Sequence, residues 1–252
     1  ITLRHIVIIP DLQAPLHDVP LVDKFISFIH DYNPHGLGCV GDFTDSTQLG
    51  RWVEGQREQY DGNLQRDFDI STDILRRIRE EYSGPFDFSR SNHDDRLFLK
   101  IKKAAPELES LRDLTIQKQL HMDELDITWH DELVNIAPGW LMGHGDEGSL
   151  SQIPGRTAYG LAVQTGMNFV CGHTHRAGIV QTSHGYNGET IRTIQGMEVG
   201  HMMDMKKATY LKGGKANWQQ AFGILHVGNG GIVYPEVIPV INGGFVVDGR
   251  EY

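Results

Sequence analysis

The stretch FVCGHTH, residues 169–175, joins a short apolar run to two histidines two positions apart. Short apolar runs that end at a glycine are typical of buried β-strands. Residues two apart in an extended segment point to the same side, so His173 and His175 can both reach one site. The stretch therefore predicts a strand over 169–172 that presents two imidazoles at its carboxyl end.

Four earlier segments repeat this pattern of an apolar run followed by polar residues. We predict strands at 5–10, 37–40, 86–90 and 140–143. The residues that follow these strands are Asp11 and Gln13, Asp42 and Asp45, Asn92, His93 and Asp94, and His144 and Asp146. Ligands bind at the carboxyl ends of the strands in open α/β sheets, so these side chains are expected to converge. Each piece alone is weak evidence, but their joint occurrence in this order indicates one site.

Amphipathic stretches separate the predicted strands. We predict helices at 19–31, 68–82, 94–104 and 107–120, where apolar residues recur at helical spacing. From about residue 191 the chain turns to strands and glycine-rich turns, including a hairpin over 229–231. The alternation of strands and helices predicts an α/β sandwich. The length of 252 residues suits a single domain over 1–252.

The overall charge limits the kinds of partner. The chain has 33 Asp and Glu against 23 Lys and Arg, which gives a formal net charge of −10. Broad binding to duplex nucleic acid or to an anionic membrane normally uses a basic surface, so the charge argues against both. A phosphate substrate remains compatible with it, because bound cations reverse the field locally.

Cysteine usage and hydropathy predict a cytoplasmic protein. Cys39 and Cys171 each lie in a predicted strand, and we expect both to be buried free thiols, as suits a reducing compartment. The chain has no apolar run of the roughly 18 residues that a membrane span needs. Residues 1–10 are interpreted as the first strand rather than a signal peptide, because the apolar run is short and no cleavage site follows.

The predicted cluster has the composition of a metal site. Carboxylate, carboxamide and imidazole ligands without thiolates suit Mn²⁺, Fe²⁺, Zn²⁺, Ni²⁺ or Mg²⁺. The blocks Asp-x-Gln, Gly-Asp-x-x-Asp, Asn-His-Asp, Gly-His and Gly-His-x-His, in this order, resemble the calcineurin-like metallophosphoesterase family over residues 5–176. The resemblance implies a two-sheet α/β/β/α sandwich with metal ligands at the carboxyl ends of the strands. The tail would supply extra strands of the second sheet.

Two positions depart from the family pattern. Gln13 stands where the family usually has histidine, and Ser91 replaces the glycine before Asn92. The segments DLQAPLHD, GDFTD and NHDDR are similar to a branch with phage-encoded members that carry this glutamine. An amide oxygen is a poorer ligand than imidazole for most transition metals, so the first metal site is expected to bind more weakly or to keep an extra water. His17 either compensates for this or lies on the surface before the next helix.

The resemblance also implies which residues bind metal. Two divalent ions, with Mn²⁺ favoured, would be bridged by Asp42. The first ion would be held by Asp11, Gln13, Asp42 and His175, and the second by Asp42, Asn92, His144 and His173.

General chemistry indicates how such a site hydrolyses an ester. Two ions about 3.5–4 Å apart can share a hydroxide that attacks phosphorus in line. His93 would protonate the leaving alcohol or would only position the phosphate. Arg96 would approach the phosphate or pair with a carboxylate. Asp45 and Asp94 would orient imidazole ligands, with a helix N-cap as the alternative for Asp94. Asp146 is expected to lie in a loop or to orient a ligand rather than to bind metal itself.

The pair Asn92-His93 and the length of the chain resemble a small phosphodiesterase branch of the family, which implies a small phosphodiester, a cyclic or short nucleotide, as the substrate. Trp52, Tyr60 and Trp218, in the polar segments 46–66 and 202–220, could stack on a base, or they could cap a core. Four lysines could attract an anion or simply be solvated: Lys206, Lys207, Lys212 and Lys215. The alternatives are a nuclease on DNA or RNA, a phosphomonoesterase, or a non-catalytic metal-binding module. A phage-encoded member would act in the host cytoplasm, and the sequence leaves the oligomeric state open.

Overall fold

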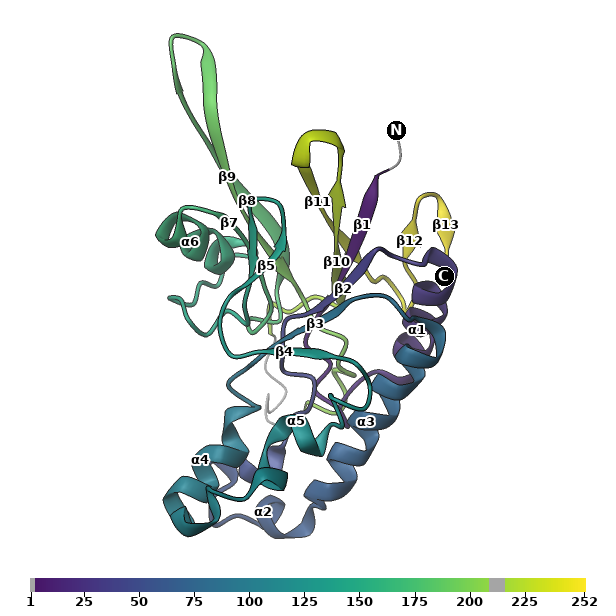
Figure 1. Ribbon diagram of the computed structural model, residues 1–252, viewed down its shortest axis with the longest axis vertical. Helices are drawn as coiled ribbons and strands as arrows, with labels where there is room; N and C mark the ends of the chain where they lie inside the picture. The colour runs from purple at the N-terminus through teal and green to yellow at the C-terminus, as the bar shows by residue number, and fades with distance from the viewer. Residues whose placement is uncertain (1–2, 209–215) are drawn as a thin grey trace.

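A computed structural model describes residues 3–208 and 216–252 of the chain and contains two main β-sheets (Figure 1). The first sheet has the strand order β11-β10-β1-β2-β3-β4. Its strands are β1 (Arg4–Ile9), β2 (Gly36–Cys39), β3 (Phe86–Ser89), β4 (Thr128–His130), β10 (Ala221–Val227) and β11 (Val233–Pro239). Strands β1 to β4 are parallel, and β10 is antiparallel to both β1 and β11. The predicted strands at 5–10, 37–40 and 86–90 are confirmed.

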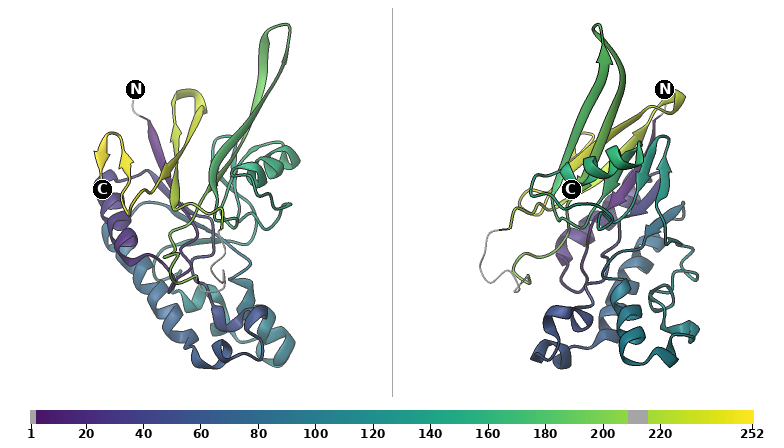
Figure 2. Two further views of the ribbon diagram at one scale, coloured as in Figure 1. Left: turned by 180° about the vertical axis from the view of Figure 1, so that it is seen from behind. Right: turned by 90° about the vertical axis from the view of Figure 1, so that its left-hand side faces the viewer.

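The second sheet has the order β5-β6-β7-β9-β8. Its strands are β5 (Val134–Ala137), β6 (Trp140–Met142), β7 (Asn168–Cys171), β8 (Ala177–Tyr186) and β9 (Glu189–Val199), and a separate pair is formed by β12 (Val246–Val247) and β13 (Arg250–Glu251). Strands β6, β7 and β9 are parallel. The β8–β9 hairpin projects well beyond the rest of the molecule, as Figures 1 and 2 show from three sides.

Helices cover the outer face of each sheet: α1 (Val19–Tyr32) and α3 (Leu64–Glu81) pack on the first sheet, and α6 (Arg156–Thr165) packs on the second. The other helices are α2 (Arg57–Asp61), α4 (Asp95–Ala104) and α5 (Ile116–Gln119). Helix α1 starts where the Asp18 side chain accepts a hydrogen bond from the Leu21 N–H, and its Phe25 and Phe28 pack against Phe222 of the first sheet. Helix α6 packs its Leu161 against the second sheet.

A separate apolar cluster fills the space between the two sheets. Trp140, fully buried, packs there with Ile8 and Val40 from the first sheet and with Val170 from the second. The layers therefore run helix, sheet, sheet, helix, and the predicted α/β/β/α sandwich of the metallophosphoesterase type is confirmed. Cys39 and Cys171 are both buried and free, as expected. Among the described residues, no helix combines the length and apolar character needed to cross a bilayer.

Some predicted elements differ from the structure. The helix predicted over 107–120 is wrong: two 3-10 helices, Pro106–Leu108 and Arg112–Leu114, precede the short α5. Leu108 and Leu111 are 40% and 51% exposed, so no core contact supports a continuous helix there. Strands begin at Ala177 rather than near 191, and α6, β4 and β5 were not predicted.

The loop expected over 46–66 is also partly wrong. It contains the 3-10 helices Thr47–Leu49 and Arg51–Val53, helix α2 and the first turn of α3. The hairpin expected over 229–231 is confirmed, because β10 and β11 pair across Asn229–Gly231.

Candidate metal centre

The two sheets bring candidate metal ligands together at the carboxyl ends of their central strands. Two groups of side chains share Asp42: one adds His144 and His173, and the other adds Asp11 and His175. Within each group the possible ligand atoms all lie within 4.8 Å of one another. Two sets of ligands that share one carboxylate have the arrangement of a site for two adjacent ions.

The group around His144 is arranged for a cation. The Nδ1 atom of His144 lies 2.8 Å from the Val40 carbonyl oxygen and therefore donates to it, which leaves the Nε2 lone pair free. That Nε2 is 2.9 Å from Asn92 Oδ1, 3.0 Å from His173 Nδ1 and 3.3 Å from Asp42 Oδ1. Four atoms with lone pairs thus face one another, an arrangement that a metal ion would stabilise.

The group around Asp11 has polar atoms that lack a partner. His175 Nε2 lies 3.2 Å from Asp11 Oδ2, and Gln13 Nε2 lies 2.9 Å from Asp42 Oδ2. Asp11 Oδ1 and Gln13 Oε1 are buried without a hydrogen-bond partner among the described residues. The two ends of a carboxamide are assigned from such contacts, and turning the amide over directs Oε1 at the same atoms. The residues therefore fit a second divalent ion.

The backbone at these positions is strained. Gln13, Asp42, His173 and His175 have φ of 56°, 46°, 64° and 56°, in the left-handed region that side chains other than glycine rarely adopt. Each such residue costs on the order of 1–3 kcal/mol, and such residues gather at functional sites. Four strained residues in one cluster support a functional role for it.

Two glycines allow the chain segments to approach. A Cβ atom at Gly172 would lie 2.1 Å from Asp11 Oδ1, and one at Gly41 would lie 2.6 Å from the Cβ of Ser91. Gly41 also has a φ of +95°. The departure from the family pattern at Ser91 is therefore accommodated because residue 41 has no side chain.

Burial and charge act against each other in the cluster. Burial disfavours the ionised form of Asp42, but His144 and His93 outweigh it and hold the pKa of Asp42 well below its usual range. Burial also works against the charge on His144, yet Asp42 raises its pKa. The cluster thus keeps the Asp42 carboxylate ionised at its centre, and that negative charge would favour a divalent cation.

His93 and Arg96 lie beside the metal-ligand cluster. His93 Nε2 is 2.6 Å from an Arg96 guanidinium nitrogen and 3.6 Å from Asp42 Oδ2, and its Nδ1 is 3.6 Å from Asp45 Oδ1. Arg96 also donates to the Asp45 carbonyl oxygen over 2.6 Å, so its main contacts are a carbonyl and an imidazole rather than a carboxylate. Burial lowers the pKa of His93, and Asp42 opposes that shift.

These side chains open on a cavity of about 310 Å³. Its walls include Gln13, Asp42, His93, Arg96, His173, His175 and Trp218. The Trp218 ring meets His175 edge-on, with 4.4 Å between the ring centroids. The cavity falls in the size range of small-ligand sites.

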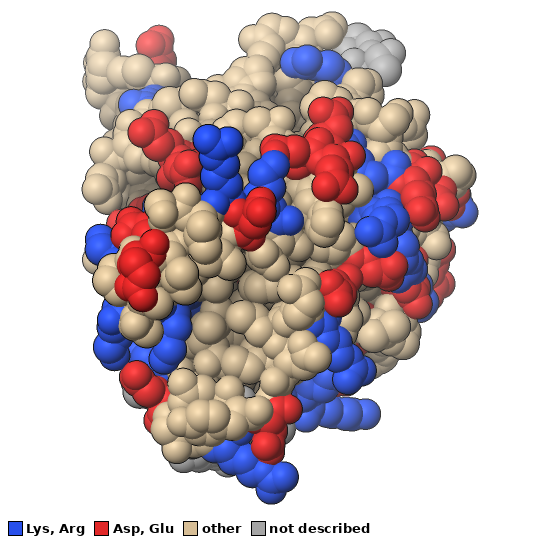
Figure 3. Space-filling view, turned by 60° about the horizontal axis from the view of Figure 1, so that its bottom comes forward, with Lys and Arg blue, Asp and Glu red and all other residues tan. Residues whose placement is uncertain are grey.

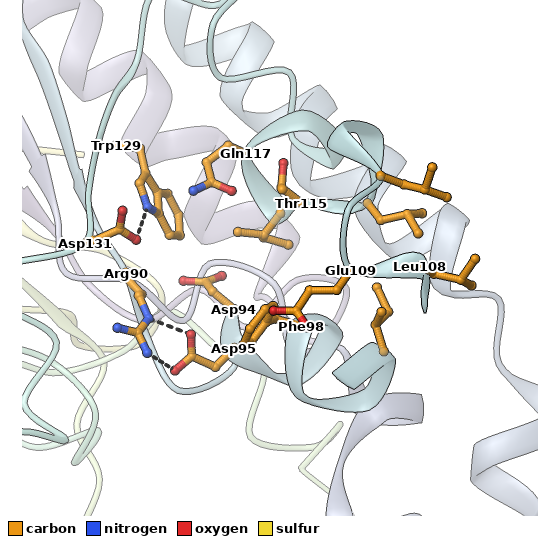
Figure 4. Close-up of a pocket in the computed structure, with 14 residues that line it drawn as sticks. Arg90, Asp94, Asp95, Phe98, Leu108, Glu109, Thr115, Gln117, Trp129 and Asp131 are labelled. Atoms are coloured by element: carbon orange, nitrogen blue, oxygen red, sulfur yellow. Dashed lines mark hydrogen bonds and ion pairs between the residues drawn. The ribbon is translucent and has the colours of Figure 1, made fainter. Parts of the chain in front are cut away.

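Asp94 stabilises the turn that carries Asn92. Its side chain accepts hydrogen bonds from the N–H and the hydroxyl of Ser91, at 2.9 and 2.7 Å. Although Asp94 stands at the N-cap position of α4, it does not cap that helix, and the N-cap alternative is wrong. Figure 4 shows Asp94 beside Phe98, below the neighbouring Trp129. Burial raises the pKa of Asp94 to about 7.

Asp146 is exposed in the turn that follows His144 and Gly145, so it lies in a loop, as one interpretation expected.

Sequence reasoning missed Glu198, a buried carboxylate behind the site. It accepts hydrogen bonds from the N–H groups of Gly155 and Thr157, both over 2.9 Å, and from the Thr174 hydroxyl over 3.1 Å. Glu198 therefore ties the start of α6 to the turn between His173 and His175. The signal was a single acid within the apolar segment QGMEVG, because a buried charge must have partners.

Other candidates lie away from the cluster. Tyr60 is 73% exposed on α2, and Lys206 is exposed. Lys207 donates to the His17 carbonyl oxygen over 3.1 Å. The side chain of Trp52, together with Lys212 and Lys215, falls outside the described part of the chain.

His17 is only 7% exposed, so the surface interpretation is wrong, and it belongs to neither ligand group found among the described residues. Burial, and then Lys207, lowers the pKa of His17 to about 4. A histidine that is harder to protonate in the folded state contributes stability above its unfolded pKa of about 6.5. That contribution is lost as the pH falls from about 6.5 towards 4.

We therefore expect a His17→Gln variant to lose less stability than the wild type between pH 7.5 and pH 5. Urea unfolding at the two pH values measures the difference. Exposed His184, replaced in the same way, serves as the control. An equal loss of stability in the wild type and the His17 variant would contradict the expectation.

Two phage proteins match almost the whole chain. No family model matches it. The Gene 54 proteins of Mycobacterium phages D29 and L5 are each 36% identical to it over 253 residues, which cover 99% of this chain and 98% of each relative. Among solved structures, Vps29 from Cryptosporidium parvum matches with a TM-score of 0.50 at 15% identity, over 99% of this chain and 98% of the other, and this likeness bears on the fold alone. The chain belongs to the family of the mycobacteriophage Gene 54 proteins.

Proposed function

We propose that the chain is a metal-dependent phosphodiesterase that hydrolyses small phosphodiesters. The observation that carries the proposal is the pair of ligand groups that share Asp42 and face one cavity. Two divalent ions, when bound, would neutralise phosphoryl oxygens and lower the pKa of a water molecule. Asp11, Gln13, Asp42 and His175 would hold one ion, and Asp42, Asn92, His144 and His173 the other.

The other residues of the cavity suit the rest of the reaction. Arg96 places its guanidinium beside the ligand cluster, where it can bind a phosphoryl oxygen. His93 lies on the same side and can give a proton to the departing alcohol. The Trp218 ring forms an apolar wall against which a base or sugar can pack. These features favour a diester with an organic group on each side as the substrate. The enzyme would act in the cytoplasm of the phage host.

Hydrolysis of bis(p-nitrophenyl) phosphate by chelator-stripped protein, with Mn²⁺ added back, tests this proposal. We expect Mn²⁺-dependent release of p-nitrophenol, with p-nitrophenyl phosphate turned over more slowly. Turnover of the monoester alone would replace the proposal with a phosphatase. If no divalent ion supported turnover of either ester, the enzyme proposal would fail for small substrates.

Gln13 provides a separate test of the ligand assignment. We expect a Gln13→His variant to bind its weaker ion more tightly, on the order of 10-fold, because imidazole is a better ligand than a carboxamide for Zn²⁺. Titration of the stripped protein with Zn²⁺, followed by calorimetry, measures the two affinities. A Gln59→His variant, outside the cavity, is the matched control. Unchanged affinity for both ions in the Gln13 variant would remove Gln13 from the ligand set.

A further inference from the structure

A second cavity, of about 360 Å³, adjoins the candidate metal centre. Gly50 and Arg96 line both cavities, and Asn92 of the ligand cluster also faces the second one. Its basic lining residues are Arg51, Arg96, Lys100 and Lys103, against one acid, Glu54, among the described residues that line it. We propose that this cavity is a subsite for a second phosphate of the substrate, so that the enzyme acts on short single-stranded oligonucleotides. The inference rests on the proposed function.

The spacing of the basic residues along α4 supports a second phosphate rather than better binding of the first. Arg96, Lys100 and Lys103 are at positions i, i+4 and i+7, which lie on one face of a helix. Seven residues of helix correspond to a rise of about 10 Å. A phosphate at the metal centre therefore reaches the Arg96 end of the row, and the Lys103 end is far enough away to bind a second phosphate.

The ion pairs already present do not prevent this binding. Glu54 Oε1 lies 3.7 Å from Lys100 Nζ and 3.3 Å from Lys103 Nζ. The Glu54 and Lys103 side chains are 51% and 72% exposed, and exposed ion pairs of this kind contribute little to stability. A phosphate with at least one negative charge can therefore displace the Glu54 carboxylate. Leu49 and the 56% exposed Leu99 line the same cavity and offer apolar surface to a sugar or base.

The charge distribution favours a single strand over a duplex. On the face that Figure 3 shows, acidic and basic side chains are interspersed, and no broad basic area stands out. The net charge of −10 also opposes a long polyanion. The basic row on α4 is thus a narrow feature, and it suits a few linked nucleotides.

Steady-state hydrolysis tests the subsite. The probes are bis(p-nitrophenyl) phosphate, thymidylyl-thymidine, which has one phosphate, and the same dinucleotide phosphorylated at both ends. We expect the double variant Lys100→Gln/Lys103→Gln to lower kcat/KM for the phosphorylated dinucleotide about 10-fold through KM, and to leave the other two substrates unchanged. Lys102→Gln, on the same helix but outside the cavity lining, is the control for charge. Equal losses on all three substrates, or the same loss in the control, would overturn the inference.

Binding without turnover separates this inference from the proposed function. We expect the affinity of metal-stripped wild-type protein for a fluorescein-labelled thymidine hexanucleotide to fall as the salt concentration rises. The double variant should reduce the slope of log affinity against log salt concentration by about 1 or more. Fluorescence anisotropy at several salt concentrations gives the slope. If the double variant reduces the slope but the wild type does not hydrolyse bis(p-nitrophenyl) phosphate, the proposed phosphodiesterase function is refuted and the subsite is supported. An unchanged slope in an active enzyme would refute the subsite alone.

Discussion

Replacing Asp42 by asparagine is expected to abolish metal-dependent hydrolysis and to lower the number of tightly bound ions from two to at most one. Asp42 is 2% exposed and belongs to both ligand groups, with Oδ1 towards His144 and Oδ2 towards Gln13. A carboxamide offers one oxygen and no charge, so it cannot serve both ions. We expect a loss in kcat/KM on the order of 10³-fold or more, because both ions act on the charge that develops at phosphorus.

Metal analysis of the dialysed variant, together with hydrolysis of bis(p-nitrophenyl) phosphate, measures both effects. The matched control is Asp73→Asn, which makes the same chemical change on an exposed residue of α3. A variant that keeps two ions and its activity would show that Asp42 is not shared. The Asn92→Ala variant provides a graded comparison, since Asn92 contacts the His144 group alone and its loss should weaken one ion.

Most of the site was predictable from the sequence because its parts are local. Each candidate ligand follows directly after a strand, and parallel strands end at the same edge, so the strand pattern alone brings Asp11, Asp42 and Asn92 together. The spacing of His173 and His175 placed both imidazoles at the cluster for the same reason. Apolar runs of four to six residues predicted these strands because they are buried on both faces.

The features that the sequence did not predict depend on contacts between distant segments. Glu198 is next to Thr174 only after β9 pairs with β7, and neither the apolar pattern nor residue spacing specifies that pairing. The stretch 107–120 has a helical pattern, yet Leu108 and Leu111 lie on the surface, and it reaches the core only at its end, through Ile116 and Leu120. His17 is buried although it precedes a helix in a polar segment, because the chain around Met203 pairs with it.

The second large effect is expected at His93, and it depends on the leaving group. The His93 imidazole lies 3.6 Å from Asp42 and contacts Arg96, on the side of the cavity where a departing alcohol can be protonated. An alkoxide leaves only with a proton, whereas p-nitrophenolate leaves without one. General acid catalysis contributes about 10²–10⁴-fold. A His93→Gln variant should therefore lose about that factor on thymidylyl-thymidine and much less on bis(p-nitrophenyl) phosphate.

The ratio of the two losses separates proton donation from phosphate positioning. If His93 only positions the phosphate, the variant should lose the same factor in activity on both substrates, because positioning acts before the bond to the leaving group breaks. If His93 donates the proton, the loss grows with the basicity of the leaving group, and a series of substituted phenyl esters gives a steeper dependence in the variant. His130→Gln, whose imidazole is 2.7 Å from Asp87 rather than in the cavity, should leave both substrates unaffected. Equal losses on the two substrates would assign the proton to another donor and leave His93, with Arg96, as a binding residue.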